Sequence, residues 1–255
     1  MNQPMKVTAI IQARMTSTRL PGKVLMEVMG RPLLSYQIER LQFSKRIADI
    51  IIATTVNKED DPIAALARTE GVSIFRGSED DVLDRYYQAG KLYSAQNIMR
   101  LTADCPLLDA NICDLIALRY LETNVEYIAT GPSFAEGLDC EVFRLSALER
   151  SWKEVRLKSE QEHVTPYIRN HPEIFQSMNL ENETDDSRYR MTVDTEEDFL
   201  VVKAILENLY RGKGQYFTIA DIKSFLDMHP EIYKLSAHII RNEGLLKSLQ
   251  EDSYN

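Results

Sequence analysis

Three cations stand close together on one predicted loop near the start of the chain, at Arg14, Arg19 and Lys23. The apolar run from Val7 to Ile11 predicts a buried strand, and Pro21-Gly22 predicts a turn in the loop that follows it. In open α/β sheets, ligands bind beyond the carboxyl ends of the strands, where backbone N–H groups, arginine forks and a lysine charge can hold a polyanion. The loop therefore favours a nucleoside triphosphate, although ordinary solvated surface cations would have the same composition.

The stretch from Ala13 to Lys23 also carries a family signature. It resembles the Ala-Arg-x-x-Ser-x-Arg-Leu-Pro-Gly-Lys nucleotide loop of the cytidylyltransferases that make CMP-activated sugars, and within them the spore coat polysaccharide biosynthesis protein F subgroup. It is not a Walker loop, because Val24 stands where a Ser or Thr would follow the lysine. The resemblance implies an enzyme that uses Mg²⁺ to transfer CMP from CTP to a sugar or sugar-acid acceptor, with release of pyrophosphate, for surface polysaccharide biosynthesis.

The resemblance assigns two stretches to the nucleotide. The implied nucleotide-binding residues are Gln12, Ala13, Arg14, Ser17, Arg19 and Lys23 in the loop, and Arg76, Gly77 and Ser78 in a second stretch that ends at Arg85. In the second stretch we expect Asp80 or Ser78 to cap the following helix, because hydroxyl and carboxylate groups satisfy the free N–H donors of a helix N-terminus. Capping explains the acids of this stretch without a ligand, but it leaves Arg76 and Gly77 unexplained.

Two aspartates are candidates for a metal site. Asp104 follows a predicted buried strand and precedes Cys-Pro, which fixes it at the mouth of the sheet. Mg²⁺ prefers carboxylates together with substrate phosphates, and the resemblance implies that Asp104 and Asp194 are its ligands and that Arg14, Lys23 and Asp104 are catalytic. The residues alone leave open a turn or cap role for Asp104 and a cap role for Asp194. Glu196 replaces a proline of the family motif, which we expect to be harmless.

The acceptor site is predicted from Asp139, Glu141, Glu162 and His163. The first two stand at alternate positions, so they would share one face of a strand that meets either sugar hydroxyls or solvent. The other two lie in a run that the family carries as Glu-Arg-Glu-His-Val-Thr-Pro-Tyr, in which Gln161 replaces the arginine here. That replacement removes a fixed cation and leaves the acceptor's identity open. A lone histidine beside an acid is also often a hydrogen-bonded structural residue.

Alternating strands and helices must position these residues. Buried strands alternate with amphipathic helices at about thirty-residue intervals, which predicts a mostly parallel sheet covered on both faces. The predicted strands are 7–11, 50–55, 72–75, 97–101, 127–130, 175–180 and 189–193, and the predicted helices are 32–44, 61–70, 110–123 with Asp109 as its cap, 146–155, 196–209 and 218–228. This α/β pattern agrees with the family's nucleotide-diphospho-sugar transferase fold, a mixed, mostly parallel sheet sandwiched by helices.

We expect residues 1–228 to form a single domain, with a nucleotide-binding half at 1–130 and an acceptor and dimerisation half at 131–195. Residues 229–255 would form a helical tail. The resemblance implies a homodimer. With 30 basic and 39 acidic residues the formal charge is −9, which argues against nucleic acid as a partner.

No apolar run approaches the roughly 20 residues that span a membrane, and no signal pattern opens the chain, so we expect a cytoplasmic protein without a membrane partner. The cysteines at 105, 113 and 140 are odd in number and lack C-x-x-C spacing, so we expect reduced thiols.

Two other functions are compatible with the sequence. A glycosyltransferase that uses a ready-made nucleotide sugar can have the same kind of fold, but it usually holds its metal on an Asp-x-Asp motif after a strand. That motif is absent around Asp104, and Asp139-Cys140-Glu141 is the stretch that most resembles it. A nucleotide-binding or scaffold protein without catalysis is the third possibility. The choice of CTP over UTP or GTP rests on the resemblance alone.

Overall fold

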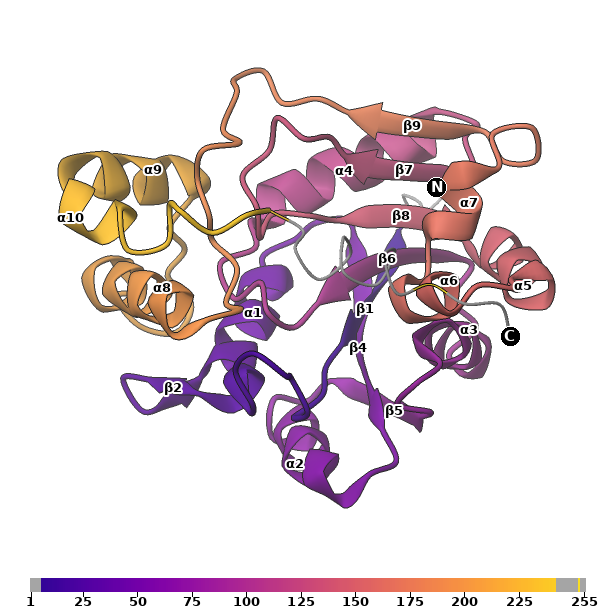
Figure 1. Ribbon diagram of the computed structural model, residues 1–255, viewed down its shortest axis with the longest axis horizontal. Coiled ribbons are helices and arrows are strands. Elements are labelled where there is room, and N and C mark those ends of the chain that lie inside the picture. The colour runs from indigo at the N-terminus through magenta and orange to yellow at the C-terminus, as the bar shows by residue number, and fades with distance from the viewer. Residues whose placement is uncertain (1–5, 242–251, 253–255) are drawn as a thin grey trace.

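A seven-stranded sheet forms the centre of the protein (Figure 1). The structure is a computed structural model that describes residues 6–241 and 252. The strands are β1 (Val7–Gln12), β4 (Ile47–Thr55), β5 (Ser73–Gly77), β6 (Asn97–Thr102), β7 (Tyr127–Thr130), β8 (Glu141–Arg144) and β9 (Ser177–Leu180). Their order in the sheet is β5-β4-β1-β6-β8-β7-β9. Neighbouring strands run parallel except at β8, which is antiparallel to both β6 and β7, so the predicted mixed, mostly parallel sheet is confirmed.

Helices cover both faces of this sheet, and others pack at its side. The helices of the described residues are α1 (Leu33–Gln42), α2 (Asp61–Thr69), α3 (Val82–Leu92), α4 (Ala110–Glu122), α5 (Leu145–Glu154), α6 (Lys158–His163), α7 (Pro166–Asn170), α8 (Glu196–Leu209), α9 (Ile219–Met228) and α10 (Pro230–Tyr233). Short 3-10 turns span Lys23–Leu25 and Lys58–Asp60, and the hairpin strands β2 (Glu27–Val28) and β3 (Arg31–Pro32) precede α1. No helix among residues 6–241 is long and apolar enough to cross a membrane.

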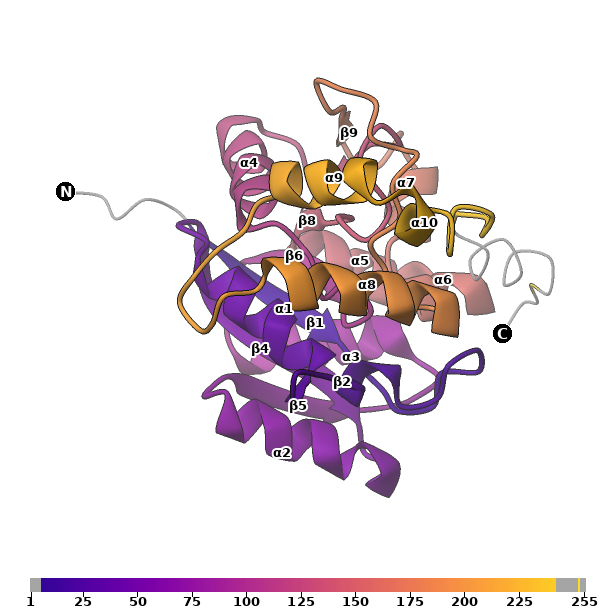
Figure 2. The same cartoon turned by 90° about the vertical axis from the view of Figure 1, so that its left-hand side faces the viewer.

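The alternating side chains of the central strands divide the core into two layers. In β1, Ala9 and Ile11 pack with α1, α2 and α4 on one face, whereas Ile10 packs with α3, α5 and α7 on the other. A third cluster lies at the side of the sheet, where α8 and α9 pack beside each other and against α1 (Figure 2). Packing in these three apolar clusters holds in position the edge of the sheet at which the parallel strands end.

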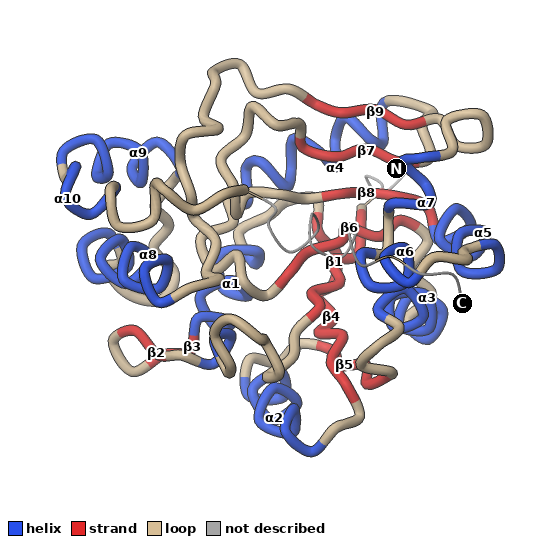
Figure 3. The backbone as a smooth tube through the Cα atoms, viewed as in Figure 1, coloured by secondary structure: helices blue, strands red, loops and turns tan. Residues whose placement is uncertain are grey.

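One predicted strand is wrong. The segment from Tyr189 to Val193 is buried, but it forms only an isolated bridge between Arg190 and Glu136 and runs as loop between β9 and α8 (Figure 3). Its backbone bonds to other loops: Met191 N–H donates to Glu136 O at 2.7 Å, and Val193 N–H donates to Asp104 O at 2.8 Å. The strand-like alternation of apolar and polar residues belongs here to extended chain that pairs outside the sheet.

Other local predictions need smaller corrections. Asp139 precedes β8 and accepts a hydrogen bond from Gly137 N–H at 3.0 Å, so it does not share a strand face with Glu141. The cap of α3 is Asp81, which accepts from Asp84 N–H at 2.8 Å, rather than Asp80 or Ser78.

The remaining local expectations have mixed outcomes. The expected cap of α4 at Asp109 is confirmed. The three cysteines are buried free thiols, as predicted. About half of the predicted helical tail, at 242–251 and 253–255, lies outside the described residues. Between 229 and 241 the tail contains the short helix α10 and is otherwise turn and loop.

Candidate active site

A cleft of about 650 Å³ opens where β1 and β6 end. Its walls come from the loop after β1, the turn after β6, the segment between β7 and β8, and the α6–α7 region. The sequence-predicted residues that line it are Gln12, Ala13, Arg14, Ser17, Arg19, Lys23, Asp104, Asp139, Glu141, Glu162, His163 and Asp194. Adjacent parallel strands present their carboxyl ends at one edge of a sheet, and this brings residues far apart in sequence together.

The Lys23 ammonium lies between the two predicted metal ligands. Its Nζ donates to Asp104 Oδ2 at 3.1 Å and to Asp194 Oδ1 at 2.7 Å. Arg19 Nη2 also pairs with Asp194 Oδ1, at 2.9 Å. Burial alone would lower the pKa of Lys23, but the two carboxylates raise it above its ordinary value. Lys23 is therefore a permanent cation in this cleft.

A closed turn carries Lys23 into the cleft. Gly22 N–H donates to Met15 O at 2.8 Å, which closes the loop, and Gly22 adopts a left-handed φ of 72°. A side chain is strained in that conformation, and an added Cβ would stand 3.2 Å from Met15 Cε. The Pro-Gly turn inferred from the sequence thus directs the chain inward, so that Lys23 is only 8% exposed.

Backbone and thiol contacts hold Asp104 in place. The hydrogen bond from Val193 N–H to Asp104 O joins the segment of Asp194 to the turn after β6, which explains why the two aspartates converge. Cys105 Sγ donates to Asp104 Oδ1 at 3.4 Å. Burial by itself would raise the pKa of Asp104, but the Lys23 ammonium and the Thr102 hydroxyl lower that pKa to about 2. Asp104 is a carboxylate at any physiological pH.

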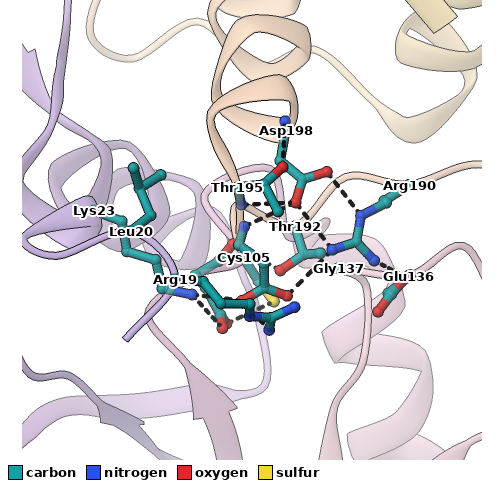
Figure 4. Close-up of polar contacts among 12 residues, drawn as sticks. Arg19, Leu20, Lys23, Cys105, Glu136, Gly137, Arg190, Thr192, Thr195 and Asp198 are labelled. Carbon is teal, nitrogen blue, oxygen red and sulfur yellow. Dashed lines mark hydrogen bonds and ion pairs between the residues drawn. The ribbon is translucent and has the colours of Figure 1, made fainter. Parts of the chain in front are cut away.

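Arg190 also holds Asp194, and in Figure 4 it lies across the group of drawn side chains from Lys23. Its Nη2 lies 3.2 Å from Asp194 Oδ2, and its Nε and Nη2 donate to Asp198 at 2.7 and 2.9 Å. A further ion pair joins Arg190 to Glu136. Thr195, not Asp194, caps α8, so the Asp194 carboxylate stays directed at the cleft. Sequence reasoning missed Arg190, and its only signal was a charge within a buried extended segment.

The two aspartates fit Mg²⁺. They provide two hard oxygen donors that already converge on one cation, and Mg²⁺ typically binds one or two carboxylates and completes its shell with water and substrate phosphates. Within residues 6–241 and 252, no three His, Cys, Asp or Glu side chains are arranged to hold a metal ion on their own. A metal at this place would therefore depend on ligands that the substrate brings.

Glu141 organises the opposite end of the cleft. Its Oε2 accepts from Arg100 Nη1 at 2.7 Å, and its Oε1 accepts from the hydroxyls of Tyr127 at 2.5 Å and Thr165 at 2.8 Å. Arg100 Nη2 in turn donates to Gln12 Oε1 at 3.2 Å. Both carboxylate oxygens are thus engaged within the protein. The network links a predicted nucleotide residue, Gln12, to the predicted acceptor end.

Replacing Glu141 by Gln should destabilise the fold by about 3 kcal/mol, because the Arg100 guanidinium would lose the charge that balances it in a largely buried place. Asp139→Asn is the matched control, since its pair with Arg241 is more exposed and should contribute no more than about 1 kcal/mol. Chemical denaturation of the two variants measures the difference. Equal free energies of unfolding would contradict the structural role of Glu141.

His163 lies at a strained turn in the same wall. Val164 adopts φ 72° and ψ −51°, and Thr165 N–H donates to His163 O at 2.8 Å. This is a γ-turn of the rare, strained kind, in a β-branched residue that strongly disfavours it. Such strain is commonly found at functional sites. His163 Nε2 is buried, and it has no hydrogen-bond partner among the described residues.

Stability should fall as the pH drops below about 6.5. Burial lowers the pKa of His163 beneath its ordinary 6.5, and Arg100 and Arg169 lower it further against the opposing effect of Glu162 and Glu141. The unfolded chain therefore binds a proton that the folded chain does not, so acidification favours unfolding. Denaturation midpoints at pH 5.5 and 7.5 should differ less in His163→Gln than in the wild type. An unchanged difference would show that other groups carry the pH dependence.

Arg76, Gly77 and Ser78 lie apart from the lining of the cleft. Arg76 donates to the carbonyl oxygens of Thr55 and Asn57, both at 2.7 Å, and pairs with Asp61 at 2.6 Å. These contacts account for Arg76 within the protein. The geometry gives no support to a nucleotide role for these three residues, which stays a prediction. The cleft also contains cations that sequence reasoning did not assign to it, at Arg85, Arg100, Arg169 and Arg241.

The chain is similar to known proteins over most of its length. The profile of a family described as cytidylyltransferase matches residues 8–232. An uncharacterized protein of Methanocaldococcus jannaschii is 40% identical over 242 residues, which are 92% of this chain and 96% of that protein. The spore coat polysaccharide biosynthesis protein SpsF of Bacillus subtilis is 33% identical over 236 residues, 87% of this chain and 94% of that protein.

Among solved structures, a cytidylyltransferase from Leptospira borgpetersenii superposes with a TM-score of 0.85 at 39% identity, over 90% of this chain and 97% of that one. The range that the family profile matches includes every predicted site residue from Gln12 to Asp194 and ends before Arg241.

Proposed function

This chain belongs to the cytidylyltransferase family, and we propose that it uses Mg²⁺ to transfer CMP from CTP to a sugar or sugar-acid acceptor with release of pyrophosphate. Its sheet and helices form the nucleotide-diphospho-sugar transferase fold of that family. One observation carries the proposal: the Lys23 ammonium lies between the Asp104 and Asp194 carboxylates. The site therefore offers both ligands for a metal and fixed charges for a triphosphate.

In the reaction we propose, an acceptor oxygen attacks the α-phosphorus in line with the leaving group. A new P–O bond to the acceptor forms, the bond to the β-phosphate oxygen breaks, and the acceptor proton passes to solvent. Arg14 and Lys23 neutralise charge on the departing pyrophosphate. Asp104 and Asp194 would hold the metal, which would supply charge stabilisation to the phosphates. Catalysis of this kind rests on positioning and electrostatics rather than on a covalent intermediate.

An acidic acceptor suits this cleft. Arg169 and Arg241 line it, and these cations would attract a carboxylate or phosphate on a sugar. The similarity to a spore coat polysaccharide biosynthesis protein supports a precursor of a surface polysaccharide as the product. We therefore propose a sugar acid, such as a 2-keto sugar acid, as the first acceptor class to test.

Pyrophosphate release from CTP and Mg²⁺ across a panel of sugar acids, sugar phosphates and neutral sugars tests this proposal. One acceptor class should give pyrophosphate in proportion to acceptor consumed, and chelation of Mg²⁺ should abolish the signal. If no acceptor supports release from CTP while a UDP- or CMP-sugar donates its sugar to one of them, the protein is a glycosyltransferase and the leaving-group roles of Arg14 and Lys23 are wrong.

A further inference from the structure

Arg85, on α3, is a buried arginine with no partner among the described residues. It is 1% exposed and lines the cleft, and its Nε and Nη1 are enclosed without a hydrogen bond. Other buried arginines of the protein are bonded: Arg40 donates to two backbone carbonyls at 3.0 Å, and Arg190 pairs with three carboxylates. A buried guanidinium without acceptors is unfavourable unless a ligand supplies them.

The surrounding described residues leave room for the Arg85 side chain but form no ion pair with its guanidinium. An added Cβ at Gly77 would stand 2.7 Å from Arg85 Cγ, so the missing side chain there makes room for the arginine stem. Asp60, a carboxylate in the vicinity, is bonded to Met15 N–H at 2.7 Å and to Thr55. Burial lowers the pKa of Arg85, yet an arginine stays charged in proteins.

Arg85 reaches the cleft from α3, beside the end of β5, whereas Asp104 follows β6. Helix α3 packs against β1, β4 and β5, and the Tyr86 hydroxyl ties it to Leu101 O of β6 at 2.7 Å and to Ile10 O of β1 at 3.2 Å. Gly77, which accommodates the arginine, ends β5, and β5 and β6 are separated by β4 and β1. Three strand spacings are about 14 Å, so a nucleotide whose phosphates lie at Asp104 and Lys23 would extend its base toward Arg85. Val82, one helical turn earlier, gives this part an apolar wall.

We propose that Arg85 selects the base, by donating hydrogen bonds from its guanidinium to O2 and N3 of cytosine. These are adjacent acceptors on cytosine, whereas uracil presents an N3–H donor that would oppose the guanidinium. The mismatch leaves buried donors unpaired, which is an effective way to reject the wrong ligand. This inference rests on the proposed function and adds to it the residue that distinguishes CTP from UTP.

Titration calorimetry of Arg85→Met with CMP, UMP and pyrophosphate, each with Mg²⁺, tests the inference. We expect the preference of the wild type for CMP over UMP to fall by roughly 10- to 100-fold, with pyrophosphate affinity unchanged. Arg119→Met, on the exposed face of α4, is the matched control and should retain the preference. A uniform loss for CMP, UMP and pyrophosphate would overturn base selection and make Arg85 a phosphate contact.

Stability provides a second readout. Removing a buried charge without partners should leave the melting temperature of Arg85→Met equal to or above that of the wild type. A clear decrease would mean that Arg85 is structural and would overturn the inference.

If Arg85→Met does not fold, Arg85→Lys is the second variant. It keeps the charge but lacks the paired N–H donors of the guanidinium, so it should also lose the preference for CMP. A wild type without any preference for cytidine nucleotides overturns the proposed function itself. A preference that persists in both variants overturns only the role of Arg85.

Discussion

Asp104→Asn should lower turnover with CTP by two to three orders of magnitude while the protein stays folded. The pKa of Asp104, lowered to about 2, means that the substitution removes a full negative charge. Losing one preorganised charge contact at a reacting centre costs about 3–4 kcal/mol of barrier, by analogy with an oxyanion-hole donor. Lys23 retains its 2.7 Å contact to Asp194 in the variant's starting geometry, so the cleft keeps its main ion pair.

Pyrophosphate release in the presence of the acceptor measures this effect, and circular dichroism verifies the fold. Asp185→Asn is a suitable control, because Asp185 is exposed and bonded only to the nearby Ser187 among the described residues. The variant should also lose most of the Mg²⁺ dependence of CTP binding. Near-wild-type turnover in folded Asp104→Asn would remove Asp104 from the catalytic set.

Lys23→Met should change metal binding and turnover in opposite directions. Without the ammonium, Asp104 loses its ion pair and Asp194 keeps its pairs with Arg19 and Arg190, so the site is more negative and Mg²⁺ should bind more tightly in the absence of nucleotide. Turnover should nevertheless fall by about 100- to 1000-fold, because a charge for the leaving pyrophosphate is gone. In the absence of Mg²⁺ the fold should lose about 3 kcal/mol, since the largely buried Asp104 carboxylate loses its ion pair with Lys23 and Asp194 loses one of its cations.

Three measurements separate these effects: Mg²⁺ titration without nucleotide, pyrophosphate release, and denaturation with and without Mg²⁺. Added Mg²⁺ should restore much of the lost stability but not the turnover. A variant that binds Mg²⁺ no better than the wild type would show that the two aspartates do not form a cation site. Retained turnover would show that Lys23 serves only as a structural counter-ion.

The sequence predicts the parallel half of the sheet well because its strands are fully buried. Runs such as Val7 to Ile11 and Ile50 to Thr55 have no polar face, and the helices between them begin and end at clear signals such as Asp61-Pro62. The prediction fails at Tyr189 to Val193, where apolar residues alternate with Arg190 and Thr192 as in a strand but the hydrogen-bond partners are loops. Burial of a segment can be inferred from its residues, whereas the backbone hydrogen-bond partners of an extended segment depend on the tertiary structure.

The candidate site shows the same limit. The loop from Gln12 to Lys23 could be assigned to the cleft because its residue types and spacing are local. Arg190 could not be, because its partner Glu136 is 54 residues away and only the fold brings them together. Arg85 is the last residue of a motif recognised in the sequence. Its lack of hydrogen-bond partners among the described residues is seen only once the structure gives the positions of the surrounding acceptors.

Titration calorimetry with CTP, UTP, GTP and ATP, each with and without Mg²⁺, and with UDP- and CMP-sugars, tests the central claim most directly. A cytidylyltransferase built around Lys23, Asp104 and Asp194 should bind CTP selectively and only weakly when Mg²⁺ is chelated. Weak binding of all triphosphates together with tight binding of a nucleotide sugar would contradict it, and would make the cleft a donor site for sugar transfer.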